Sequence, residues 1–153
     1  MSLSEILSLD ILGKNIMIIG FPATGKTWLS DKISKHTHKL IHTDIFKSFG
    51  YEEGMYYALK AALSSEKNTI VEGIFGYRML RKGAQMKTYF PDIVIEMKIS
   101  NSKMVKTYLK ERDEKKIKHL RQFNDNLNKV LNDYRAICPE EKKPIWIEFL
   151  NNY

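Results

Sequence analysis

At 153 residues the chain has the size of one domain with its own core, and its 43% hydrophobic and 28% charged residues are typical of a soluble globular protein. No apolar run approaches the roughly 20 residues of a membrane-spanning helix, and the first five residues lack the basic start of a secretory signal. The single cysteine, Cys138, excludes an intramolecular disulfide and fits a reducing compartment, so we expect a cytoplasmic protein.

The net charge of +7 is unevenly distributed along the chain. Residues 98–121 hold nine Lys or Arg and three acids, whereas the rest of the chain is nearly balanced. A segment as basic as this suits a polyanion, either nucleotide phosphates or a nucleic acid backbone. A solvated helix face would carry the same charges, so the charge pattern alone leaves both interpretations open.

The predicted elements alternate between short apolar strands and helices. Five segments have the pattern of strands, at residues 15–19, 39–44, 70–73, 93–98 and 145–149. Helical patterns occupy the intervals between them, at 25–36, 45–67, 78–88 and 102–137. This alternation predicts a single α/β domain over residues 1–153, with a five-stranded parallel sheet covered by helices on both faces.

A phosphate-binding motif joins the first predicted strand to the first predicted helix. Residues 20–27 read Gly-Phe-Pro-Ala-Thr-Gly-Lys-Thr, which fits the pattern G-x-x-x-x-G-K-[ST]. An unbroken apolar run, Ile16–Ile19, precedes the motif, and helical spacing of apolar residues follows it. A chance match in a glycine-containing loop is the alternative, but the strand and the helix lie where a phosphate loop needs them.

Each position of this motif has a physical role. Gly20 and Gly25 allow main-chain angles and close approaches that a side chain would prevent. The amides that follow point inward at the positive end of a helix and bind anions. Lys26 reaches the β- and γ-phosphates, and the Thr27 hydroxyl coordinates Mg²⁺. The predicted ATP-binding residues in this loop are Gly20, Ala23, Thr24, Gly25, Lys26 and Thr27.

Two acids end the next two predicted strands. Asp44 ends the second strand, and Glu72 ends the third. The carboxyl ends of parallel strands are where α/β sheets bind ligands, so Asp44 is a candidate functional acid, with a helix N-cap as the alternative. Glu72 lies where a phosphate-loop enzyme needs an acid that holds magnesium directly or through water, together with Thr27.

Aromatic residues are concentrated between these two acids. The cluster consists of Phe46, Phe49, Tyr51, Tyr56 and Tyr57. Such rings beside a phosphate site could stack on a base, but at helical spacing they are more often part of the core. The four histidines show no ligand spacing, and we expect them to be surface or core residues.

With these residues placed, the chain resembles the small P-loop kinases, which include nucleoside, nucleotide, shikimate, gluconate and 5′-hydroxyl polynucleotide kinases. The resemblance covers nearly the whole chain in element order, and the phosphate loop is its specific motif. It implies the strand order 2-3-1-4-5 and a helical basic lid at about 110–121. Within this lid, it implies that Arg112 and Arg121 contact phosphates, with Arg112 acting in catalysis.

The resemblance also assigns roles on the acceptor side. Asp44 lies where nucleoside and polynucleotide kinases keep an acid that accepts the hydroxyl proton. The stretch from Val71 to Arg78 is similar to the Asp-Gly-Phe-Pro-Arg stretch of adenylate kinases, with Glu72 replacing Asp and a longer spacing to the arginine. Arg78 and Arg81 are therefore candidate substrate contacts. Only 24 residues separate Asp44 from Thr69, which leaves little room for a separate monophosphate-binding domain.

These features favour an ATP- and Mg²⁺-dependent kinase that phosphorylates a hydroxyl of a nucleotide, a nucleoside or a nucleic acid, including a modified base within DNA. A GTPase fits poorly, because Asn128-Lys129 is not followed by the acid that recognises guanine and no Asp-x-x-Gly follows the third strand. Two alternatives stay open. One is an ATP- and nucleic-acid-binding module without turnover, and the other is a kinase of a small metabolite or antibiotic.

Overall fold

The structure is a computed structural model, which describes the whole chain except residues 23, 35–37, 66–67, 100–105, 107–116 and 152–153. The described helices are α1 (Leu3–Leu7), α2 (Lys26–Ile33), η1 (Thr43–Phe49), α3 (Tyr51–Leu63), α4 (Gly76–Met86), α6 (Ile117–Ile137) and η3 (Glu140–Lys142), of which η1 and η3 are 3-10 helices. The strands are β1 (Ile16–Gly20), β2 (Lys39–His42), β3 (Thr69–Glu72), β4 (Ile93–Lys98) and β5 (Ile145–Leu150).

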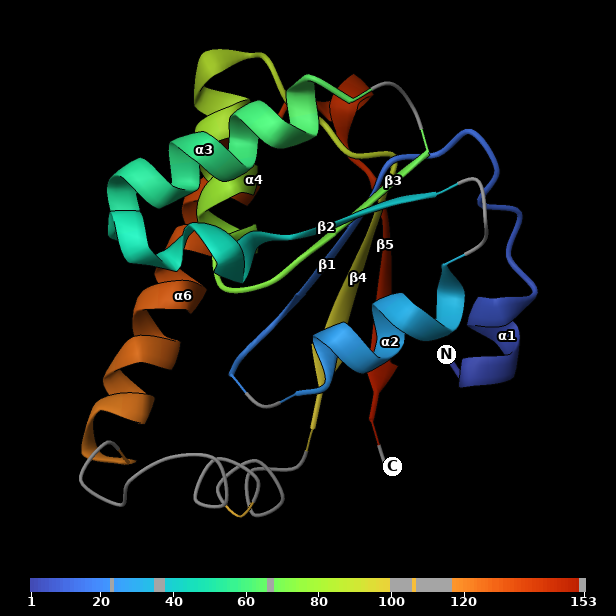
Figure 1. Cartoon of the computed structure of the whole chain (residues 1–153), viewed down its shortest axis with the longest axis horizontal. Helices are drawn as coiled ribbons and strands as arrows, with labels where there is room; N and C mark the ends of the chain where they lie inside the picture. Colours follow the sequence, from blue (N-terminus) through green and yellow to red (C-terminus); the bar gives the residue numbers. More distant parts are fainter. Residues whose placement is uncertain (23, 35–37, 66–67, 100–105, 107–116, 152–153) are drawn as a thin grey trace.

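The five strands form one parallel sheet in the order β2-β3-β1-β4-β5 (Figure 1). This confirms the predicted fold class and strand order. The register aligns Gly20 of β1 with Met97 of β4 and Phe149 of β5, and Ile18 of β1 with Glu72 of β3 and His42 of β2. The carboxyl ends of all five strands therefore meet at one edge of the sheet, the edge at which β1 leads into the phosphate loop.

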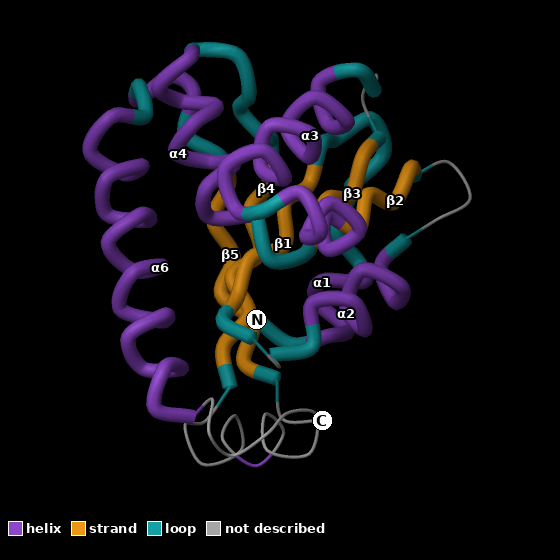
Figure 2. Tube along the Cα trace, turned by 60° about the vertical axis from the view of Figure 1, so that its left-hand side comes forward, coloured by secondary structure: helices purple, strands orange, loops and turns teal. Residues whose placement is uncertain are grey.

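Successive residues of the central strands belong to two separate cores, and helices cover both faces of the sheet (Figure 2). Met17, Val71 and Val94 point toward α3, α4 and α6, in a core that mixes aliphatic side chains with methionines and aromatic rings. On the other face, Ile16, Ile18 and isoleucines of the adjacent strands point toward α1 and α2, in a core that is largely isoleucine. Because both faces of β1 are fully buried, the apolar run before the phosphate loop has no alternation of polar and apolar residues.

The largest difference from the predicted boundaries lies after β2. The strand ends at His42, two residues before the predicted end, and the chain continues as η1. Gly50 then separates η1 from α3 with a φ of +88°, so the predicted single helical stretch of residues 45–67 is two elements joined by a sharp turn. Asp44 consequently belongs to the first turn of η1 rather than to the strand. None of the described helices is long and apolar enough to cross a bilayer.

Candidate functional site

The shape of the phosphate loop is set by its two glycines and by the side chain of Thr24. Gly25 has a φ of +94° immediately before α2 begins, a conformation that strongly favours glycine. A Cβ atom at Gly20 would lie 2.5 Å from Thr24 Oγ1 and 2.9 Å from Met97 Cβ. The Thr24 hydroxyl in turn donates to the Phe21 carbonyl at 2.8 Å. Gly25 is thus explained by its positive φ, and Gly20 by the close approach of Thr24 and Met97.

Lys26 is the first residue of α2, and its side chain folds back over the loop. Its Nζ donates to the carbonyl oxygens of Gly20 and Phe21, each at 3.1 Å. The ammonium group is therefore held within the turn, beside the positive end of α2. A cation in this position can neutralise the charge of phosphates bound by the loop amides.

Thr27 and Glu72, the two residues predicted to hold magnesium, are in direct contact. The Thr27 hydroxyl donates to Glu72 Oε1 at 3.2 Å, and Glu72 is only 4% exposed. The same oxygen lies 2.5 Å from His42 Nδ1. The sequence interpretation missed His42, although the register of the adjacent strands β2 and β3, which pairs His42 with Glu72, is the signal that could have found it.

This pair of oxygen atoms fits a magnesium ion. Mg²⁺ takes oxygen ligands and is usually held by one or two carboxylates together with substrate phosphates and water. Thr27, near the start of α2, offers a hydroxyl, and Glu72, at the end of β3, offers a buried carboxylate. In the described part of the chain, no three His, Cys, Asp or Glu residues group together as a metal cage. A metal here would be shared between the protein and a bound nucleotide.

Asp44 connects η1 to the loop that follows β3. Its Oδ1 accepts a hydrogen bond from the Ile74 amide at 2.7 Å, and its side chain is exposed. Within the described residues its Oδ2 accepts no hydrogen bond. The N-cap position of η1 is occupied by His42, without a side-chain bond, so Asp44 does not cap its own helix. The carboxylate is therefore fixed by one oxygen and open at the other.

Gly73 allows Asp44 to come this close. Its φ is +127°, and a Cβ atom there would overlap Thr43 Oγ1 and lie 2.8 Å from Asp44 Oδ1. The glycine of the Glu72-Gly73 pair is thus required by the approach of η1 to the end of β3. This contact brings the two predicted acids, Asp44 and Glu72, to the same edge of the sheet.

Arg78 lies four residues beyond Ile74, and its guanidinium group lies over two neighbouring rings. Its Cζ is 4.9 Å from the ring centre of Tyr51 and 5.9 Å from that of Phe123. Burial lowers the pKa of its guanidinium group below the usual value. Its Nη1 is buried and has no hydrogen-bond partner among the described residues. A desolvated cation with this surplus donor would be stabilised by an anionic ligand.

Arg81, the second predicted substrate contact, is engaged elsewhere. Its Nη1 pairs with Asp133 Oδ2 at 3.0 Å and so joins α4 to α6. Ala23, Arg112 and residues 110–116 of the predicted lid lie outside the described residues, as does the side chain of Arg121. The roles given to Ala23, Arg112 and Arg121 stay predictions.

Neither a family model nor a curated protein matches this sequence. Among solved structures, a shikimate kinase from Acinetobacter baumannii in complex with shikimate is similar at 14% identity. The match covers 99% of this chain and 88% of that one, with a TM-score of 0.57. A deoxyadenosine kinase from M. mycoides with bound dATP matches at 15% identity over 90% of each chain, with a TM-score of 0.46. The chain has the fold of the small P-loop kinases.

In this P-loop kinase fold the predicted aromatic cluster lies largely at the surface. Phe49, Tyr51 and Tyr57 are between 45% and 51% exposed, and Tyr56 is 39% exposed. The ring centres of Phe49 and Tyr57 are 4.6 Å apart. The cluster therefore contributes less to the core than its helical spacing indicated. Rings exposed beside η1 are available to a ligand.

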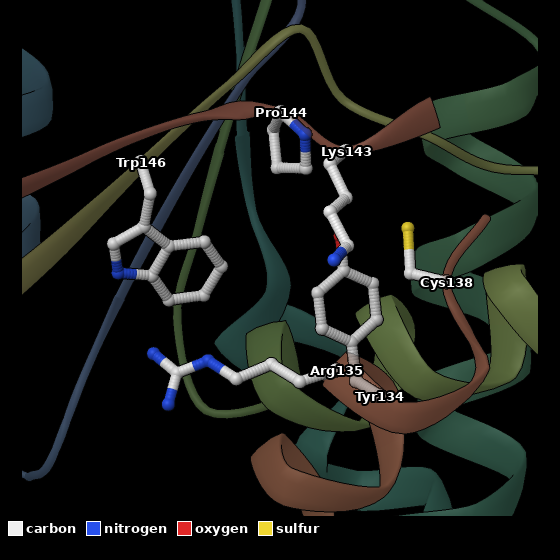
Figure 3. A pocket seen from close by; sticks show the side chains of 6 residues that line it. All are labelled: Tyr134, Arg135, Cys138, Lys143, Pro144 and Trp146. Atoms are coloured by element: carbon white, nitrogen blue, oxygen red, sulfur yellow. The ribbon is translucent and has the colours of Figure 1, made fainter. Parts of the chain in front are cut away.

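A separate pocket of about 250 Å³ lies between the end of α6 and the start of β5 (Figure 3). It is lined by Tyr134, Arg135, Cys138, Lys143, Pro144 and Trp146. The sheet register pairs Trp146 of β5 with Val94 of β4, and Val94 with Met17 of β1. Met17 lies three residues before Gly20, the last residue of β1. None of the predicted site residues of the P-loop kinase fold lines this pocket, and we assign it no part in phosphate binding.

Proposed function

We propose that the protein is an ATP-dependent kinase that transfers the γ-phosphoryl group to a hydroxyl of a nucleotide, a nucleoside or a nucleic acid. One observation carries the proposal. Lys26 in the phosphate loop, the Thr27–Glu72 pair and the half-engaged carboxylate of Asp44 lie along one edge of the sheet. A protein that only bound nucleotide could use the bond from Asp44 to the Ile74 amide, but it would have no use for a second, open carboxylate oxygen on the acceptor side of that edge.

On the phosphate side, positioning and charge neutralisation would supply most of the rate. The loop amides would bind the phosphate oxygens, and Lys26 would move from the carbonyls of Gly20 and Phe21 to the β- and γ-phosphates. Thr27 and Glu72 would hold Mg²⁺, which, when bound, neutralises charge on the phosphate oxygens. Ala23, Arg112 and Arg121 would complete the phosphate contacts, as the family resemblance implies.

On the acceptor side, Asp44 would orient the hydroxyl and take its proton. As that proton moves to the carboxylate, the hydroxyl oxygen forms a bond to the γ-phosphorus, and the bond to the bridging oxygen of ADP breaks. The hydrogen bond from the Ile74 amide holds one carboxylate oxygen, which leaves Oδ2 to face the acceptor. Arg78 would pair with an anionic group of the acceptor, because its Nη1 has no partner in the described structure.

The net charge of +7 and the short acceptor segment between Asp44 and Thr69 favour a nucleotide or nucleic acid over a neutral metabolite. The similar shikimate kinase structure contains shikimate, a small carboxylate-bearing alcohol. Its fold, shared here at a TM-score of 0.57, keeps a small-metabolite kinase as the second candidate. An arginine with a surplus donor suits a phosphate or a carboxylate equally, so Arg78 does not choose between the two acceptor classes.

A transfer screen with γ-labelled ATP tests the proposal. The acceptors are nucleosides, nucleotides, single- and double-stranded DNA with and without hydroxylated bases, RNA, sugars and shikimate. We expect label to pass to an acceptor that carries a base, and no transfer by the Lys26→Ala variant. A rate that falls steeply between low and moderate salt identifies a polyanionic acceptor. ATP binding without transfer to any acceptor would favour the non-catalytic module instead.

A further inference from the structure

Asn151 follows the last residue of β5 and reaches the phosphate loop from the opposite end of the chain. It is 7% exposed, and its backbone amide donates to the Lys98 carbonyl at 2.7 Å, which extends the ladder between β4 and β5 by one bond. Its side-chain Nδ2 donates to the carbonyl oxygen of Thr24 at 2.9 Å, across 127 positions of sequence. The carboxyl end of the edge strand is thus tied to the main chain of the loop.

The bond from Asn151 controls more than a carbonyl group, because the peptide bond is planar. The Thr24 carbonyl and the Gly25 amide belong to one trans peptide unit, in which C=O and N–H point in opposite directions. Fixing the Thr24 oxygen toward Asn151 therefore fixes the Gly25 N–H away from it. Gly25 has a φ of +94° and enough freedom to rotate this peptide if nothing restrained it.

We propose that Asn151 is a positioning residue that holds the peptide between Thr24 and Gly25 with its N–H directed into the phosphate cradle. This inference rests on the proposed nucleotide binding and deepens it, because it makes phosphate affinity depend on β5 as well as on the loop motif. A Cβ atom at Gly25 would lie 2.6 Å from Asn151 Nδ2, so the amide packs directly against the restrained peptide.

The chemistry requires an amide rather than a carboxylate at this position. A carboxylate has nearly the same shape as the amide but can only accept hydrogen bonds. Its oxygen would face the oxygen of the Thr24 carbonyl, with no hydrogen atom between the two acceptors. The cost of such an unmatched buried acceptor exceeds that of simply deleting the side chain's bond. Asn151→Asp should consequently turn the peptide more than Asn151→Ala does.

The test compares Asn151→Asp, Asn151→Ala and a matched control, Asn132→Asp, which changes an exposed asparagine of α6 in the same way. The measurements are the dissociation constants for ATP and for ADP, the melting temperature, and the ¹⁵N–¹H resonance of Gly25 without nucleotide. We expect roughly tenfold to hundredfold weaker binding for Asn151→Asp, a smaller loss for Asn151→Ala and none for the control. The Gly25 resonance should shift in both Asn151 variants.

Three outcomes overturn the inference. The first is wild-type affinity in Asn151→Asp. The second is an unmoved Gly25 resonance. The third is a lowered melting temperature with unchanged nucleotide affinity at low temperature, which is the result for a purely structural bond. If the unaltered protein binds neither ATP nor ADP, the proposed function fails as well, whereas tight binding by all three variants removes only the role of Asn151.

Discussion

The phosphate side and the acceptor side of this site are built in different ways. On the phosphate side, the contacts involve the main chain: Lys26 Nζ, Thr24 Oγ1 and Asn151 Nδ2 all donate to loop carbonyls. On the acceptor side, the surroundings of Arg78 come from side chains of different helices, because its guanidinium group on α4 lies over a ring of α3 and a ring of α6.

This difference explains why one side can be recognised from sequence and the other cannot. A loop whose geometry is set by its own backbone needs glycine at fixed positions, so it leaves a motif. A cluster assembled from helices far apart in the chain needs only rings and a cation of suitable size, which many sequences can supply. The predictions that follow test whether the two sides also separate in function.

The largest effect is expected on the phosphate side, from Lys26→Ala. Turnover should fall below detection, because a preorganised cation beside the transferred phosphoryl group is lost. The melting temperature should fall little, because the side chain is not part of either hydrophobic core. Lys32→Ala, which removes an exposed lysine of the same helix, is the control in both assays. Full turnover by Lys26→Ala would contradict the kinase proposal altogether.

Asp44→Asn tests the junction between the two sides. The asparagine oxygen can still accept from the Ile74 amide, so the loop and the melting temperature should be preserved. Turnover should nevertheless fall by roughly 10²–10⁴-fold, the usual contribution of a general base. ATP affinity should stay the same, because the phosphate loop is unchanged.

The control is Asp31→Asn, at an exposed position of α2. Loss of metal-dependent ATP affinity in Asp44→Asn would show that Asp44 serves the metal instead. Unchanged turnover would leave it as a brace between η1 and the loop after β3. Turnover, ATP affinity and melting temperature measured on one preparation distinguish these three roles.

Arg78→Lys and Arg81→Lys test the acceptor side as a pair. Lysine keeps the charge but loses the planar group that lies over the rings of Tyr51 and Phe123, so Arg78→Lys should raise the acceptor KM about tenfold. The KM for ATP should not change. Arg81→Lys should leave the acceptor KM unchanged, because Arg81 is engaged with Asp133 of α6. Equal effects of the two substitutions on the acceptor KM would contradict the role of Arg78.

The sequence predicted the fold because short segments rich in apolar residues alternate with helical patterns, and a phosphate-binding motif joins the first strand to the first helix. It also predicted Thr27 and Glu72 as magnesium ligands; the two side chains are hydrogen-bonded to each other, and their role in holding a metal stays a prediction. It did not predict that His42 contacts Glu72, because that contact follows from strand register rather than from spacing along the chain. Asn151 was missed for a similar reason, since its partner lies at the other end of the sequence.

The smallest expected effect concerns the stability of the helices that support the acceptor side. Burial raises the pKa of Tyr89 far above its usual value, and a nearby Asp92 adds to the shift. Its hydroxyl has no hydrogen-bond partner among the described residues. Burial is also the chief cause that raises the pKa of Tyr77 in α4 and the pKa of Tyr134 in α6. Of these three tyrosines, Tyr77 also stacks on Phe21 of the phosphate loop, with the ring centres 6.3 Å apart.

Tyr89→Phe should therefore leave stability nearly unchanged at neutral pH and protect it at alkaline pH. A tyrosine whose folded pKa is raised contributes its full stability below the unfolded value of about 10 and loses it as the pH rises further. Each such tyrosine costs roughly 1.4 kcal/mol per pH unit above that value, so removing one should flatten the alkaline decline by that amount. Melting temperatures between about pH 8 and pH 11 measure this, with Tyr56→Phe, at a largely exposed position, as the control. An identical alkaline decline in wild type and Tyr89→Phe would show that the Tyr89 hydroxyl reaches solvent before the fold opens.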